Sequence, residues 1–212
     1  MNRFEKAVTV INNSCDKYRF YLSEAEIGLI ATDLLTSGLF ENKITVDELE
    51  QGEVFKWGDK EYIKLDTLNE GCLCLAKDVW FKSKFDDQTN DWNKSQLRGY
   101  IATKAIDFIP DIDKLMLFDR DLTTDDGLTD YGYCYDDAIS MLTCDEYRKY
   151  RKFIPTTDER YWTITADSII YSSFVRFIYS DGALNGGNTY CEHVGVRPLI
   201  CLDKDTLVEV EE

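Results

Sequence analysis

The sequence predicts an α+β protein, in which a short helical N-terminus precedes a mixed, mostly antiparallel β domain with two or three helices. Three observations lead to this expectation. Apolar residues recur at helical spacing over the first forty residues, they alternate along short stretches from Val54 onward, and glycines punctuate the C-terminal part. Aromatic residues make up 13% of the chain, which is usual where β-structure is abundant.

The N-terminal segment, residues 1–48, is expected to be helical. The spacing of apolar residues predicts a short amphipathic helix from Phe4 to about Asn13. Ser23 and Glu26 have the spacing of a capping box, in which each side chain bonds to the backbone N–H of the other residue. A second helix should follow, ended at Ser37-Gly38 because glycine readily adopts the left-handed conformation after a helix.

The remaining residues, 49–212, are expected to form the α+β domain. Val54–Trp57 and Lys60–Leu65 alternate on either side of Gly58-Asp59, which predicts a β-hairpin, and Cys72–Ala76 continues as a third strand. Helices are expected over Ser95–Phe108, before Pro110, and over Thr143–Lys152, opened by a threonine cap. Residues 161–202 should be β-rich.

Composition indicates a cytoplasmic protein with no membrane span. The N-terminus lacks the unbroken apolar run of a secretion signal, and no window approaches 18 apolar residues. The seven cysteines have no repeated spacing, so free thiols in a reducing compartment are expected.

The strongest signal is negative charge. The net charge is −16, and residues 107–137 carry ten aspartates against one lysine and one arginine, a net of −8. Such a surface repels nucleic acid and attracts basic proteins, although an acidic surface also serves solubility alone. The expected partner-binding residues are Asp119, Asp121, Asp125, Asp126, Asp130, Asp136 and Asp137.

Six motifs occur in order along residues 50–203. They are Gly52–Trp57, Asn90–Arg98, Asp121–Gly127, Leu142–Tyr150, Tyr161–Thr165 and Gly195–Ile200. The series resembles an uncharacterised domain family of Firmicutes and their phages, which has a Trp-x-x-Ser-x-Leu-Arg helix and a closing Gly-Val-Arg-Pro strand. The chain departs from that pattern at Trp162-Thr163-Ile164-Thr165, where many members carry a second Trp and an Arg.

The resemblance implies a fold similar in plan to C-type-lectin-like and formylglycine-generating-enzyme-like domains. In those domains a glycine-rich C-terminal half supplies the ligand surface. It implies no established activity, and no pair of cysteines here matches the copper-holding pair of the formylglycine-generating enzymes.

Catalysis is not expected. The one histidine, His193, follows Cys191 by two residues, and strand alternation does not turn such a pair toward one another. Asp125 and Asp126 are adjacent, so they rarely share a face, and an enzyme using them remains a third hypothesis. We expect no cofactor.

A metal site is not expected either. Cys72-Leu73-Cys74 is too tight for a zinc knuckle, although Cys191 and His193 with a distant cysteine remain an alternative. A calcium loop starting at Asp119 has threonine where glycine is required, so only an irregular calcium site remains open there.

The segment Gly182–Asn188 lacks the lysine of a phosphate-binding loop, so a β-turn loop is expected. A ligand-contacting loop is the functional alternative, with Asn185, Asn188, Thr189 and Tyr190 as its binding residues.

Arg197 lies in an apolar strand, where a guanidinium needs a partner. The sequence predicts a bidentate carboxylate, either Asp91 or Asp167. Arg197 is therefore interpreted as a structural clamp, together with Arg98, Trp92 and Trp162.

The leading hypothesis is a non-enzymatic acidic binding protein of phage or mobile-element type. In its sharpest form the protein is an anti-defence inhibitor, against CRISPR or restriction, that engages a basic nucleic-acid-binding host protein such as a nuclease. The alternative is a lectin-like module that binds a glycan or small polar ligand through its C-terminal loops.

Overall fold

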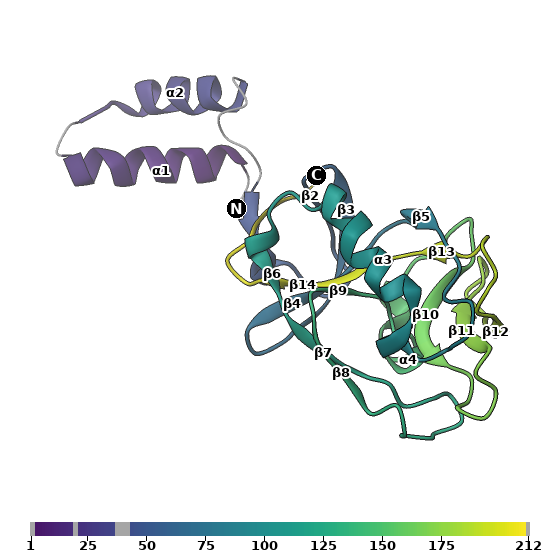
Figure 1. The fold of residues 1–212 in the computed structure, drawn as a ribbon. Helices are drawn as coiled ribbons and strands as arrows, with labels where there is room; N and C mark the ends of the chain where they lie inside the picture. Colours follow the sequence, from purple (N-terminus) through teal and green to yellow (C-terminus); the bar gives the residue numbers. More distant parts are fainter. Residues whose placement is uncertain (1–2, 19–20, 37–42, 211–212) are drawn as a thin grey trace. The chain divides into compact units, whose positions relative to one another are not determined.

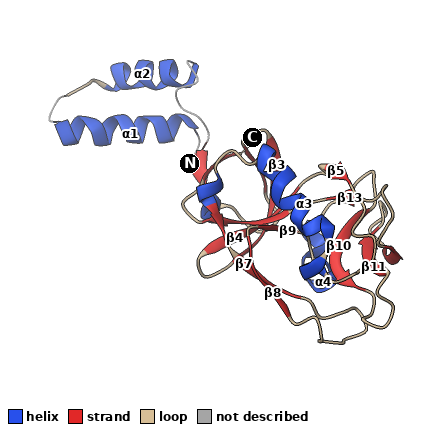
Figure 2. Cartoon of the chain, in the orientation of Figure 1, coloured by secondary structure: helices blue, strands red, loops and turns tan. Residues whose placement is uncertain are grey.

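The computed structural model describes residues 3–18, 21–36 and 43–210. The chain divides into two compact units, Met1–Lys43 and Ile44–Glu212. Figure 2 shows that the first unit is helical and that strands dominate the second. Residues 44–48 belong to the second unit, whereas the sequence predicts them in the N-terminal segment. Val46 among them is buried in the core of the second unit, as is the following Leu49.

The first unit is a helical hairpin of α1 (Arg3–Tyr18) and α2 (Glu24–Thr36). Its small core contains Ala7, Ile11, Cys15 and Ala31. The helix α1 runs beyond Asn13, where it was expected to end, because Cys15 extends the apolar stripe of Ala7 and Ile11 by one more turn.

The capping box of α2 is confirmed. The Glu26 carboxylate accepts the Ser23 backbone N–H at 2.8 Å, and the Glu26 N–H donates to the Ser23 hydroxyl at 3.4 Å. The predicted stop at Ser37-Gly38 lies outside the described residues.

The larger sheet of the second unit has eight strands, seven in the order β1-β15-β2-β3-β4-β14-β6, with β9 also paired to β14. Their bounds are β1 Lys43–Thr45, β2 Val54–Trp57, β3 Lys60–Thr67, β4 Gly71–Ala76, β6 Leu115–Met116, β9 Ile139–Ser140, β14 Leu199–Asp203 and β15 Leu207–Glu209. The predicted hairpin and third strand are therefore confirmed as β2, β3 and β4, joined in antiparallel register.

A second sheet has five strands in the order β12-β11-β10-β13-β5. Their bounds are β5 Phe81–Lys82, β10 Tyr161–Ala166, β11 Phe174–Ile178, β12 Leu184–Asn188 and β13 Gly195–Val196. A separate two-stranded hairpin contains β7 (Phe118–Asp121) and β8 (Tyr133–Asp137). In Figure 1 the two sheets lie on either side of α3 (Gln96–Lys104).

Both helices predicted for this unit are shorter than expected. The helix α3 ends at Lys104 and continues as the 3-10 turn Ala105–Phe108. Phe108 is 36% exposed and packs edge-on against Trp80, so it does not join the buried face of α3. The helix α4 (Cys144–Tyr150) likewise passes into the 3-10 turn Arg151–Phe153.

Further 3-10 turns occupy Val46–Glu48, Trp92–Lys94 and Ile112–Lys114. The second of these leads into α3, and Ser95 begins that helix by accepting the Arg98 N–H at 3.2 Å.

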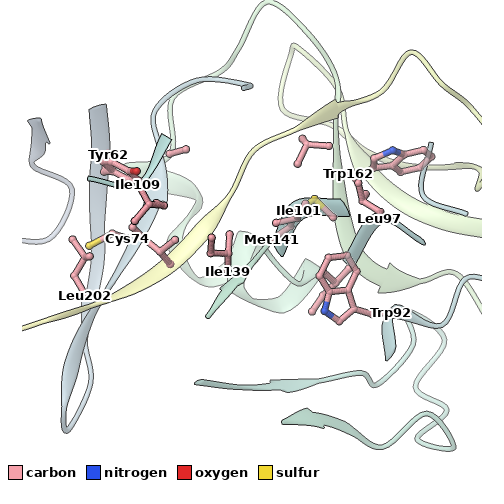
Figure 3. Close-up of a cluster of buried hydrophobic side chains, with 14 of the residues drawn as sticks. Tyr62, Cys74, Trp92, Leu97, Ile101, Ile109, Ile139, Met141, Trp162 and Leu202 are labelled. Carbon is pink, nitrogen blue, oxygen red and sulfur yellow. The ribbon is translucent and has the colours of Figure 1, made fainter. Parts of the chain in front are cut away.

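The main core joins both sheets to α3. Figure 3 shows Leu97 and Ile101 of α3 beside Met141, with Trp92 and Trp162 nearby, and Tyr62 and Cys74 of the larger sheet in the same cluster. Some of its aromatic side chains pack edge to face, as Phe85 does against Trp162 with ring centroids 6.1 Å apart. This core is therefore rich in aromatic side chains.

The mixed α+β class, with short helices and mostly antiparallel strands, is confirmed. The finer C-type-lectin-like plan remains a prediction. Within the described residues, no helix has both the length and the apolarity needed to cross a membrane.

Candidate functional site

The β7–β8 hairpin lies within the acidic stretch of the sequence. Residues of β7 alternate between buried and exposed, so Phe118 and Arg120 face inward while Asp119 and Asp121 face solvent. Asp121 lies opposite Tyr133 on β8. The outer face of β7 therefore presents two carboxylates two residues apart.

A β-bulge near the end of β8 sends the adjacent residues Asp136 and Asp137 to opposite faces of the hairpin. Phe118 pairs with Asp137 and Arg120 with Cys134, so Tyr135 and Asp136 together oppose Asp119. Asp136 has a φ of 59°, in the left-handed region that asparagine and aspartate tolerate better than most residues. The extra residue leaves Asp136 exposed and turns Asp137 into the interior.

Asp137 is a buried acceptor rather than a surface residue. It is 4% exposed, and its carboxylate accepts the Trp92 indole N–H at 2.8 Å and the Arg98 Nε–H at 2.8 Å. The expectation that Asp137 binds a partner is wrong, because a neighbouring arginine neutralises its charge inside the protein. The same contacts explain why Trp92 and Arg98 occur together in one motif.

Arg120 ties the hairpin to α4. This buried guanidinium donates from both terminal nitrogens to the Glu146 carboxylate and also to the Met141 carbonyl at 3.0 Å. Glu146 in turn accepts the Thr143 backbone N–H at 2.8 Å, while the Thr143 hydroxyl accepts the Glu146 N–H at 3.0 Å. The predicted threonine cap is confirmed, and its glutamate doubles as the partner of Arg120.

A pocket of about 470 Å3 opens between the hairpin and α4. We call it the acidic pocket; its charged lining residues are Asp119, Asp121, Asp125, Asp145, Glu146, Arg120 and Arg148. Asp125 is 15% exposed and pairs with Arg148 at 2.7 Å and Arg176 at 2.9 Å. Its charge is therefore largely neutralised within the protein, so Asp125 is less available to a partner than Asp119 and Asp121.

The outer carboxylates of the acidic pocket, Asp119 and Asp121, have hydrogen-bond partners but no ion-pair partner among the described residues. Asp121 accepts the Thr123 N–H at 2.9 Å, and Asp119 accepts the Asp136 N–H at 3.3 Å. In the part of the chain that the structure describes, neither has an arginine or lysine partner. Their negative charge is therefore available to a ligand.

Asp126 and Asp130 are also exposed on the loop between the two strands. Hydrogen bonds from Thr124 and Ser168 lower the pKa of Asp126, so this carboxylate stays ionised at neutral pH. Five of the seven predicted partner-binding aspartates are thus on the surface, namely Asp119, Asp121, Asp126, Asp130 and Asp136.

Two tyrosines on the hairpin were not predicted from the sequence. Tyr133 and Tyr135 are 53% and 63% exposed, and their rings stack at 6.1 Å between centroids. Exposed tyrosines beside charged groups are common in protein interfaces. The alternation of Tyr133, Cys134 and Tyr135 was a signal for an outward aromatic pair.

The predicted C-terminal ligand loop does not have its expected form. Residues 184–188 form the edge strand β12, paired in register with β11. Thr189 is completely buried, whereas Asn185 and Tyr190 are exposed. The backbone carbonyl of Asn188 accepts the Cys191 N–H at 3.1 Å. Glycines at 186 and 187 fit this strand because Arg176 and Phe177 of β11 lie against them.

The metal and histidine alternatives depend on Cys191 and His193, which lie at or near the surface. His193 is exposed and Cys191 is half-buried. Across the described ranges, no three histidine, cysteine, aspartate or glutamate side chains are grouped to hold a metal ion.

Arg197 is completely buried, but its predicted carboxylate partner is wrong. Its guanidinium donates to the carbonyls of Ala76 at 2.8 Å, Lys77 at 2.7 Å and Pro155 at 3.3 Å, and to the Tyr161 hydroxyl at 3.1 Å. Burial lowers the pKa of Arg197, and Tyr161 opposes that effect.

The two carboxylates proposed for Arg197 have other partners. Asp91 caps the turn at Asn93 and pairs with Lys94, and Asp167 pairs with Arg176. Trp162 is buried in the core and donates its indole N–H to the Ser83 carbonyl at 2.9 Å.

No protein-family model, curated protein or solved structure matches this chain.

Proposed function

We propose that this protein is a non-enzymatic binding protein whose β7–β8 face engages a basic protein. The observation that carries the proposal is the pair Asp119 and Asp121, exposed at the acidic pocket without an ion-pair partner among the described residues. A lysine or arginine side chain of a partner would gain a charge-assisted bond there.

The surroundings of the pair support a protein partner. Tyr133 and Tyr135 offer exposed aromatic area next to the carboxylates, and aromatic side chains contribute much of the binding energy at protein interfaces. The net charge of −16 would speed association with a basic surface.

The narrower proposal is an anti-defence role. In it, the acidic face occupies the nucleic-acid channel of a host nuclease of a CRISPR or restriction system. The sign of the charge supports this version. The glycan-binding alternative has less support, because Thr189 is buried and residues 184–188 form a strand.

The test is direct binding to purified nucleases of such systems, measured by biolayer interferometry at low and high salt. The Asp119→Lys/Asp121→Lys variant should weaken binding about ten-fold or more, and salt should weaken the wild-type interaction steeply. Asp125 is left intact because its ion pairs with Arg148 and Arg176 hold the fold.

A matched control reverses two other exposed acids, Asp59 and Glu70, which lie on turns of the larger sheet. The Asp59→Lys/Glu70→Lys variant has the same net charge as the test variant. Equal loss of binding in both variants would leave only an effect of overall charge, and salt-independent binding would remove the charge argument.

A further inference from the structure

A second surface feature lies on the outer side of α3. A groove of about 530 Å3 runs between this helix and the segment that includes β6 and β9. We call it the α3 groove; its apolar walls are formed by Gly99, Ala102, Ile106, Ile112, Leu115 and Ile139. It is separate from the acidic pocket, since the two have no lining residue in common.

The groove is open because two residues of α3 are small. A Cβ atom added at Gly99 would meet no other atom within 4 Å, and Ala102 is exposed one turn further along. The helix α3 thus turns a shallow, small-residue face outward while Leu97 and Ile101 fill the core (Figure 3). Small side chains allow another helix to approach closely.

Large apolar side chains stand exposed at the groove. Ile106 is 44% exposed and Ile112 is 52% exposed. Covering them would contribute roughly 25 cal/mol for each Å2 of apolar surface removed from water. An apolar groove of this kind suits the apolar face of an amphipathic segment.

The charges around the groove indicate that such a segment would be positively charged. Asp136 lines the groove and is exposed, and the exposed acids Asp107, Asp111 and Asp113 adjoin Ile106 and Ile112 in the chain. None of these four has an ion-pair partner among the residues that the structure describes. The charge of Arg98 within the groove is neutralised by Asp137 at 2.8 Å.

We infer that the α3 groove docks a basic amphipathic helical segment of the partner, with apolar residues against Gly99 and Ala102 and lysines or arginines facing the surrounding aspartates. This inference rests on the proposed function, because it assigns a basic partner to the same protein. It adds a second contact, whose specificity comes from apolar shape rather than charge alone.

The probe is a fluorescein-labelled synthetic helix of leucine and lysine with all leucines on one face, titrated into the full chain by fluorescence anisotropy. Two reference peptides accompany it. One has the same composition in scrambled order, which removes the apolar face, and the other replaces lysine with glutamate. The amphipathic lysine peptide should bind at least about ten-fold more tightly than either.

The discriminating variant is Gly99→Leu, which fills the groove. The open space beside Gly99 accommodates the new side chain, and leucine favours the helix more than glycine does, so the melting temperature should not fall. Binding of the amphipathic peptide should weaken about ten-fold, and methyl NMR signals of Ile106 and Ile112 should shift on peptide addition only in the wild-type protein.

The outcomes separate the two proposals. Unchanged peptide binding by Gly99→Leu, or equal binding of the scrambled peptide, overturns the α3 groove as a docking site. If Asp119→Lys/Asp121→Lys still weakens nuclease binding, the proposed function survives that failure. A wild-type dimer that Gly99→Leu converts to a monomer would instead identify the groove as a contact between copies of this chain, and would equally overturn the inference.

Discussion

Two regions of the molecule each contain a buried charge, and the two charges are stabilised differently. One region is the β7–β8 hairpin, and the other is the connection between the C-terminal strands β13 and β14. Asp137 on the hairpin has a charged partner, Arg98. Arg197, between β13 and β14, has only neutral acceptors, namely three carbonyls and a tyrosine hydroxyl. The hairpin thus has a buried carboxylate on one side and exposed carboxylates on the other, whereas Arg197 is completely buried.

The largest expected effect is therefore at Arg197. In Arg197→Met the buried carbonyl of Ala76 and the part-buried carbonyl of Lys77 lose the bonds that Arg197 donates, and an unsatisfied buried acceptor costs about 1–3 kcal/mol. The melting temperature, measured by circular dichroism, should fall by roughly 10 °C. The melting temperature of Arg197→Lys, which retains some of the hydrogen-bond donors, should lie between those of the wild type and Arg197→Met. An unchanged melting curve for Arg197→Met would contradict the clamp interpretation.

The next effect is at Asp137. Asp137→Ala leaves the Arg98 guanidinium without its carboxylate and the Trp92 N–H without an acceptor, which should cost about 3 kcal/mol in urea unfolding. Asp136→Asn is the matched control, because its side chain is exposed, asparagine also tolerates the left-handed backbone at this position, and stability should change by less than about 1 kcal/mol. Equal losses in both variants would contradict the division of roles by the bulge.

At neutral pH the smallest effect is that of the buried thiols, whose contribution appears only at high pH. Burial, with Asp137 nearby, raises the pKa of the Cys134 thiol to about 12, and burial raises that of Cys201 to about 11. In the unfolded chain thiols ionise near pH 8.5, so the unfolded state alone loses these protons between about pH 9 and pH 11. Folding stability should fall with rising pH across that window and be unaffected by these thiols below it.

Urea unfolding at several pH values checks this prediction. The Cys134→Ala/Cys201→Ala variant should lose less stability than the wild type between pH 8 and pH 10.5. If both proteins lose the same amount, the thiols are not responsible for the alkaline sensitivity.

Features encoded within a few residues were predictable from sequence. The capping box at Ser23, the threonine cap at Thr143 and the hairpin β2–β3 depend only on short-range spacing. The acidic stretch was also found, because charge is additive along the chain.

Features that depend on distant partners were not predictable. Nothing local distinguishes Asp136 from Asp137; the difference lies in a bulge set by β7 and in Trp92, 45 residues away. Asp125 was likewise taken for a surface acid because Arg148 and Arg176 approach it only in the folded chain. Arg197 donates to carbonyls instead of a carboxylate because β4 ends beside it. The contact joins Arg197 to Ala76, which is 121 positions away in the chain.

The bulge in β8 also has a consequence for insertions and deletions. Asp136 is the additional residue, so a chain lacking it would return to regular pairing, with Tyr135 opposite Asp119 and Asp137 still opposite Phe118. The interior would keep its acid while the surface lost one. Length variation at this single position can thus alter what the hairpin presents to a partner without disturbing the packing beneath it.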